Sequence, residues 1–234
     1  MNCQPLSGGA TQTARSAEPV VVRDVMIVDD HPLMCEALSL TLEHVFDLTR
    51  VRQCADLAAA EESIRLRGAP DAVVLDLDLP DVRGMEGLLA LRARLGARVP
   101  ITVISAGLDR SIVSAAIAAG ARGVISKSLP RADMTDAFER MWQGERVLPE
   151  GMEATDPEDE EQRDLLRRIA TLTPQQLRIL RLLCEGRPNK VISWKLSISE
   201  ATVKTHLAAI MAKINARNRT QAALLASRAR VFPQ

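Results

Sequence analysis

The 234-residue chain is 47% hydrophobic, enough to bury a core, and its 30 basic residues balance its 30 acidic ones. No run of about 18 apolar residues marks a membrane span, and the first two dozen residues lack the apolar stretch of a signal peptide, so we expect a cytoplasmic protein without a membrane partner. The four cysteines are scattered without a CxxC pair, which argues against a metal knuckle or a disulfide framework.

The net charge of zero conceals two parts of opposite sign. Residues 1–170 carry 19 Lys and Arg against 28 Asp and Glu, a balance of −9, whereas residues 171–234 carry 11 against 2, a balance of +9. The sign changes after an acidic stretch at 150–164 that is typical of an exposed linker. We therefore predict four segments: a disordered arm at 1–24, a first domain at 25–145, an acidic linker at 146–170 and a second domain at 171–234.

The first domain alternates strand-like and helix-like patterns. Short apolar runs predict strands at 25–29, 72–76, 99–105 and 123–126, with a weaker one at 48–53. Helical periodicity predicts helices at 33–45, 57–67, 85–95, 110–119 and 132–143. Five such units with nearly continuous apolar strands indicate an α/β fold, a doubly wound parallel sheet with helices on both faces.

Polar residues stand where these strands end. Asp29 and Asp30 end the first strand and Asp76 ends the third. Ser105 ends the fourth strand, and Lys127 follows the fifth. The carboxyl ends of parallel strands meet at one edge of the sheet, where ligands bind. Three carboxylates at that edge would repel one another without a cation, and Mg²⁺ with its preference for oxygen ligands fits such a cluster.

The segments VDDHP, DLDLPDVRG, ISA and SKS, in this order and at these intervals, resemble the receiver domain of bacterial two-component response regulators over residues 25–143. The resemblance implies a flavodoxin-like fold in which Asp76 accepts a phosphoryl group from a sensor histidine kinase. It also implies the other site residues: Asp29, Asp30 and the backbone carbonyl of Asp78 as Mg²⁺ ligands beside Asp76, and Ser105 and Lys127 as the groups that bind the phosphoryl oxygens.

Two positions leave alternatives open. Val124 stands three residues before Lys127, where receivers mostly place a Tyr or Phe that turns inward on activation. This departure puts switching by such an aromatic in question. His31 is either a metal ligand or base, or, in the interpretation that we favour, a residue that starts a helix before Pro32.

Two other functions fit parts of the sequence. The DLDLP segment resembles haloacid-dehalogenase-type phosphatases, but those need a Thr or Ser soon after the second Asp, whereas Leu79 and Pro80 follow Asp78 here. We therefore expect no enzyme. The second alternative is an orphan regulator whose receiver works without phosphorylation, mainly in dimerisation, and Val124 keeps it open.

The second domain carries helix signals and no strand pattern. LTPQQLRILRLLCEG starts with Thr173 as N-cap, Pro174 at the first helical position and Gln176 to complete a capping box. Further helices are predicted at about 189–196 and after Ser199, and this pair forms a helix-turn-helix. The apolar residues expected to face the core from the later helix are Ala201, Leu207, Ile210, Met211 and Ile214.

Residues 172–226 resemble the four-helix effector domain of the LuxR, NarL and FixJ class through LTP, RILRLLCEG, NK, ISEATVKTHLAAIMAKI and RNRTQA. The excess of basic residues independently indicates binding to nucleic acid. The resemblance implies two sets of contacts with double-stranded DNA: Lys204, Thr205 and Ala208 near base edges, and Thr202, His206 and Lys213 near phosphates.

The sequence thus predicts a DNA-binding transcription factor that is active as a homodimer on an inverted-repeat promoter site, with RNA polymerase as a candidate further partner. The last helix, RTQAALLASRA, offers small apolar residues suited to the two-fold contact of this class. Trp194 is expected to pack on the core of its own domain. Because the two domains have opposite charge, the unphosphorylated receiver is expected to cover the recognition helix.

Overall fold

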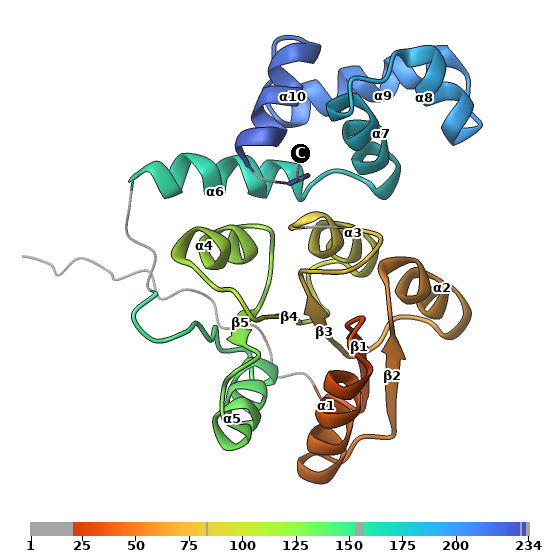
Figure 1. Cartoon of the computed structure of the whole chain (residues 1–234). Coiled ribbons are helices and arrows are strands. Elements are labelled where there is room, and N and C mark those ends of the chain that lie inside the picture. The colour runs from red at the N-terminus through yellow and green to blue at the C-terminus, as the bar shows by residue number, and fades with distance from the viewer. Residues whose placement is uncertain (1–20, 83, 153–156, 230, 233–234) are drawn as a thin grey trace, which may run out of the picture.

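The protein is seen here in a computed structural model that describes residues 21–82, 84–152, 157–229 and 231–232. Most of the predicted N-terminal arm lies outside this described part. The first domain holds a five-stranded parallel sheet in the order β2-β1-β3-β4-β5 (Figure 1). Its strands are β1 (Asp24–Val28), β2 (Arg50–Cys54), β3 (Ala72–Asp76), β4 (Ile101–Ser105) and β5 (Gly123–Ser126).

Helices cover both faces of this sheet, as the sequence predicted. They are α1 (Pro32–Val45), α2 (Leu57–Arg67), α3 (Glu86–Leu95), α4 (Arg110–Ala118) and α5 (Arg131–Trp142). The two-residue alternation of β1 divides the core, since Val25 and Ile27 pack with α1 and α5, whereas Met26 and Val28 pack with α2, α3 and α4. The predicted doubly wound α/β class is confirmed.

The second domain is helical throughout its described residues. Its helices are α7 (Pro174–Cys184), α8 (Asn189–Leu196), α9 (Glu200–Lys213) and α10 (Arg219–Arg228). The predicted capping box is present, because Thr173 Oγ1 accepts from Gln176 N at 3.3 Å and Gln176 Oε1 accepts from Thr173 N at 3.1 Å. The predicted helix-turn-helix is therefore α8 followed by α9.

The predicted acidic linker is wrong in part, because residues Pro157–Ile169 form helix α6. Leu166 and Ile169 are fully buried, in a hydrophobic cluster that also contains Ala115 and Ala118 of α4. Ion pairs one turn apart, such as Arg168 Nη2 to Asp164 Oδ2 at 2.6 Å, reduce the repulsion among its charges. Apolar residues one turn apart thus anchor a segment that composition alone assigned to solvent.

Two predictions of burial in the second domain are also wrong. Trp194 is 80% exposed, and Ala201 is exposed as well, whereas Val203 is buried in its place. Ile192 is the residue of α8 that fills the core. Trp194 lies two residues further along the chain, about 200° around the helix from Ile192. Trp194 therefore faces away from the core.

The two domains share one continuous apolar core through α6. This helix lies along α4, and α7 lies above α3 (Figure 1). Within the described residues no helix is both long and apolar enough to cross a bilayer.

Substitution of Leu166 tests the packing of α6. Leu166→Ala should lower the free energy of unfolding by about 2–5 kcal/mol, because it leaves a cavity between α6 and α4. The measurement is urea unfolding followed by circular dichroism, with Arg167→Ala on the exposed side of the same helix as the control. Equal stability of the two variants would show that α6 is not packed.

Candidate functional site

Four side chains meet at the carboxyl edge of the sheet. Strands β1 and β3 are neighbours, with Val28 opposite Leu75, so their ends lie side by side. Asp29 and Asp76 are each 2% exposed, whereas Asp30 is exposed. Ligand atoms of Asp29, Asp30, His31 and Asp76 all lie within 4.8 Å of one another. The predicted convergence of the three acidic residues is confirmed.

Lys127 reaches the two buried acids from the end of β5. Its Nζ lies 2.8 Å from Asp29 Oδ2 and 2.8 Å from Asp76 Oδ2. Burial alone would lower the pKa of this ammonium, but the hydrogen bonds and charges of the two carboxylates outweigh burial and raise its pKa. Lys127 is therefore held as a cation between the two buried carboxylates.

Ser105 lies on the strand next to Asp76. It is buried at the end of β4, where Asp76 is opposite Ile104, and its carbonyl oxygen accepts from Lys127 N at 2.9 Å. Three neighbouring strands thus place a carboxylate, a hydroxyl and an ammonium at one edge, as the sequence predicted.

The donor set fits Mg²⁺. Asp76 Oδ1 is buried and has no hydrogen-bond partner within the described part of the chain. Lys127 provides one positive charge against three carboxylates, so a divalent cation would complete the balance. Carboxylate oxygens and a backbone carbonyl are ligands of the kind that Mg²⁺ prefers.

The loop after β3 is fixed in place by α2. Asp81 Oδ1 accepts from Leu57 N at 3.1 Å and its Oδ2 accepts from Ala58 N at 3.0 Å. These two hydrogen bonds cap the start of α2 and hold the loop whose backbone carries Asp78. The side chain of Asp78 is exposed, so a metal contact through its backbone carbonyl would leave the carboxylate in solvent.

His31 lies both at a helix start and inside the acidic cluster. It is the N-cap residue of α1, as favoured from the sequence, and makes no side-chain capping bond. Its Nδ1 lies 3.0 Å from Asp29 Oδ1 and 2.7 Å from Asp30 Oδ1. The side chain is 65% exposed, so it can move aside when a cation binds these oxygens.

The sequence did not single out Cys35, which supports Asp29 from α1. Its Sγ donates to the Asp29 carbonyl at 3.2 Å, and burial followed by the charge of Asp29 raises the pKa of the thiol. The signal in the sequence that could have identified this contact is a cysteine on the side of the first helix that faces the sheet.

Val124 is buried in β5 opposite Val103.

Helix α9 presents most of the predicted DNA-contacting residues to solvent. Thr202, Lys204, Thr205 and Ala208 are exposed, and His206 is half-buried. Ser199 Oγ caps the helix by accepting from Thr202 N at 3.0 Å. Lys213 is exposed too, and its Nζ donates to Thr171 O at 2.8 Å and to Gln176 Oε1 at 2.9 Å.

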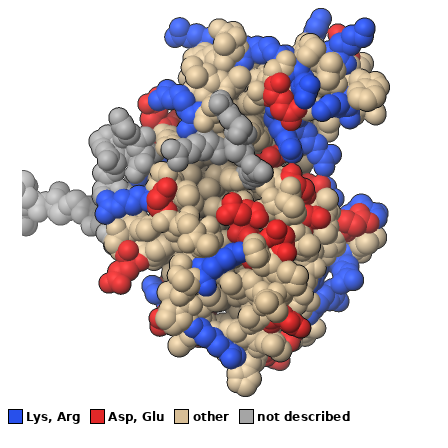
Figure 2. Space-filling view, in the orientation of Figure 1, with Lys and Arg blue, Asp and Glu red and all other residues tan. Residues whose placement is uncertain are grey.

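The first domain packs against α7, and within the described residues the predicted DNA-contacting face of α9 stays exposed. Arg178 Nη2 lies 3.0 Å from Glu61 Oε2, and Arg181 Nη1 lies 3.0 Å from Glu86 Oε1. Figure 2 shows basic side chains on the upper lobe and acidic ones on the receiver just below it. Opposite charges therefore do meet, but the prediction that the receiver covers the recognition helix is wrong.

Comparison with known proteins identifies both domains. Residues 25–139 match the response regulator receiver domain, and residues 170–226 match the bacterial regulatory proteins of the luxR family. The glycerol metabolism activator of Pseudomonas putida is 36% identical over 208 residues, which cover 86% of this chain and 94% of that protein. The nitrate/nitrite response regulator protein NarL of Escherichia coli K12 is 30% identical over 222 residues, 89% of this chain and 96% of that protein.

A solved structure of two RcsB dimers bound to two parallel DNAs has a similar fold. Its TM-score is 0.50 at 22% identity, with 88% of this chain and 98% of that chain covered.

Magnesium titration tests the acidic cluster. Asp29→Asn should weaken Mg²⁺ binding about tenfold or more because it removes a charged oxygen ligand, whereas Lys127→Met should strengthen it because a competing cation is lost. Isothermal titration calorimetry measures both affinities. Asp78→Asn is the matched control and should change little, since only its backbone carbonyl is the expected ligand. Weaker binding by Lys127→Met would contradict this arrangement.

Proposed function

The chain belongs to the response regulators that join a receiver to a LuxR-type DNA-binding domain, and from this premise we propose that a sensor histidine kinase phosphorylates Asp76 to control DNA binding. The family consists of DNA-binding transcription regulators. The observation that carries the proposal is the contact of Lys127 with both buried acids, Asp29 and Asp76. We keep 25–145 and 171–234 as the proposed domain bounds, with α6 between them.

The geometry of these groups supports the following proposed transfer. A carboxylate oxygen of Asp76 forms a bond to phosphorus while the P–N bond of the kinase's phosphohistidine breaks. The negative charge of the transferred group meets the ammonium of Lys127 and the hydroxyl of Ser105. Bound Mg²⁺, held by Asp29, Asp30, Asp76 and the carbonyl of Asp78, would supply further charge neutralisation.

DNA binding is assigned to α9. We propose that Lys204, Thr205 and Ala208 approach base edges in the major groove and that Thr202 and His206 lie near phosphates. We propose that Lys213, which is exposed and bonded to two oxygens of its own domain, also lies near phosphates. The RcsB structure contains dimers on DNA, and we propose the same for this chain on an inverted repeat, with RNA polymerase as a further partner at the promoter.

A second candidate function is favoured by Val124. Without an aromatic residue at this buried position, the receiver could act as a dimerisation module that does not need phosphorylation. Phosphoryl uptake by the purified protein separates the two functions.

Asp76→Asn should abolish phosphoryl uptake while the fold is kept, because the change preserves shape and removes one clustered charge. The measurement is incubation with acetyl phosphate and Mg²⁺, followed by a phosphate-sensitive gel. Asp78→Asn, an exposed acid two residues away, is the control and should retain uptake. Uptake by Asp76→Asn at the wild-type level would move the nucleophile elsewhere, and absence of uptake by the wild type would favour the orphan regulator.

Lys204→Ala should cost about 1–3 kcal/mol at the preferred site and relax discrimination there, because the residue lies in the first turns of the recognition helix. The measurement is the affinity for DNA selected from a random pool compared with unselected DNA, at several salt concentrations. An equal loss of affinity for both DNAs would make Lys204 a phosphate contact instead.

A further inference from the structure

A small cavity lies where α6 runs along α4, beside the segment that follows α5. It measures about 240 Å³ and is lined by three arginines: Arg146 from the segment after α5, and Arg163 and Arg167 from α6. No acidic residue of the described part of the chain lines it. We call it the arginine cavity.

Two walls of the arginine cavity are held by hydrogen bonds. Arg163 Nε donates to Ser114 Oγ of α4 at 2.9 Å, and Ser114 is buried. The Ser114 hydroxyl keeps its own hydrogen, which it can donate to a ligand. Val124 N donates to Val147 O at 3.0 Å, which fixes the segment that carries Arg146 against β5. The fold therefore sets the positions of these donors.

The charges around the arginine cavity are not balanced. Glu160 is the acid that pairs with its arginines, since Oε2 lies 3.3 Å from Arg163 Nη1 and Oε1 lies 3.6 Å from Arg167 Nη1. Arg146 is exposed and makes no ion pair within the described residues. Three positive charges against one negative charge leave an excess of +2. A hollow lined by one sign of charge concentrates ions of the opposite sign.

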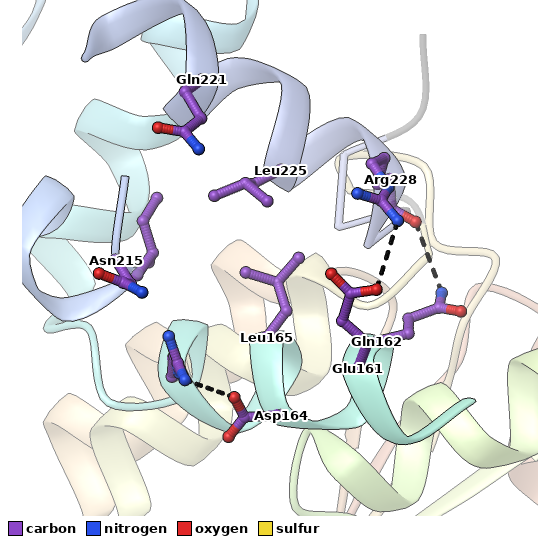
Figure 3. Close-up of a pocket in the computed structure, with 10 residues that line it drawn as sticks. Glu161, Gln162, Asp164, Leu165, Asn215, Gln221, Leu225 and Arg228 are labelled. Carbon is purple, nitrogen blue, oxygen red and sulfur yellow. Dashed lines mark hydrogen bonds and ion pairs between the residues drawn. The ribbon is translucent and has the colours of Figure 1, made fainter. Parts of the chain in front are cut away.

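The larger cavity between α6 and α10 has a different arrangement of charge (Figure 3). There Arg228 Nη2 lies 3.8 Å from Glu161 Oε2, and Arg168 Nη2 lies 2.6 Å from Asp164 Oδ2. Both arginines and both acids line that cavity, so its charges cancel. The excess positive charge is thus a property of the arginine cavity and not of α6 as a whole.

The wall opposite the charged groups is apolar. It is formed by Val113, Ile117 and Ala118 of α4 together with Leu148. The volume of about 240 Å³ is below the roughly 300–1,000 Å³ of sites for drug-sized ligands. The ligand that fits is therefore small, with one compact anionic end and a short apolar body.

We propose that the arginine cavity binds a small phosphate monoester. Such an ester carries a charge of about −1.5 to −2 at pH 7, which matches the excess of +2. Guanidinium groups bind phosphate oxygens through paired N–H donors, and the carbon body of the ester would lie on the apolar wall. The site shares no residue with the acidic cluster at Asp76, so the proposal does not depend on phosphorylation of the chain.

Isothermal titration calorimetry of the full-length protein with phenyl phosphate tests the site. Mg²⁺ is left out, because the acidic cluster then has excess negative charge and repels the anion. Arg146→Gln and Arg167→Gln should each weaken binding about tenfold, since each removes a charge-assisted hydrogen bond. Arg98→Gln changes an exposed arginine of the first domain outside the cavity, and this matched control should bind as wild type does.

Two further variants test the competing acid and the apolar wall. Glu160→Gln should strengthen binding about threefold, because a carboxylate that competes for Arg163 and Arg167 is lost. Leu148→Ala should weaken the binding of phenyl phosphate about fivefold and leave that of inorganic phosphate unchanged. Wild type should accordingly bind phenyl phosphate more tightly than inorganic phosphate.

The outcomes separate this site from general attraction of anions. Tighter binding of phenyl phosphate than of benzoate and inorganic phosphate, weakened in both arginine variants and kept in Arg98→Gln, would support the proposal. No binding by wild type, or binding that Arg146→Gln and Arg167→Gln leave unchanged, would overturn it. Equal affinity for benzoate would exclude recognition of phosphate, and equal affinity for inorganic phosphate would exclude recognition of an ester.

Discussion

The constraint on which the rest of the structure depends is the burial of two carboxylates beside one ammonium. Asp29 and Asp76 are each 2% exposed, and removing such charges from water costs several kcal/mol per ion unless they are paired. Lys127 pairs with one oxygen of each acid, which leaves Asp76 Oδ1 buried and unbonded within the described residues. Only strands that end side by side in a parallel sheet can hold these groups so close. The result is a site with excess negative charge that favours a cation.

Helices α3 and α4 of the receiver support the second domain. The ion pairs of Arg178 and Arg181 with the receiver involve arginine side chains that are 58% and 44% exposed, so they orient the domains more than they stabilise the contact. The apolar contacts between α4 and α6 and around Phe232 contribute more. Because the receiver packs against α7, the exposed face of α9 that carries Lys204 stays open to solvent.

Local patterns were enough to predict the sheet and its site. The apolar runs 72–76 and 123–126 have the same bounds as β3 and β5, and the residues at the strand ends lie where a parallel sheet must bring them together. The errors concern contacts between distant parts of the chain. The docking of α6 against α4 depends on which surfaces meet, and a local pattern does not identify the partner surface. The apolar residues of α6 recur at helical spacing and indicate a buried helix face. The acidic residues around them obscured this signal, because they are typical of an exposed linker.

Hydrogen–deuterium exchange with and without acetyl phosphate and Mg²⁺ tests most directly whether the charge state of Asp76 controls the contact between the domains. The account predicts faster exchange in α6 and in the last turn of α10 after phosphorylation, while β1 and β3 keep their protection because the sheet itself does not open. Unchanged exchange in α6 and α10, in a sample shown to be phosphorylated at Asp76, would contradict it.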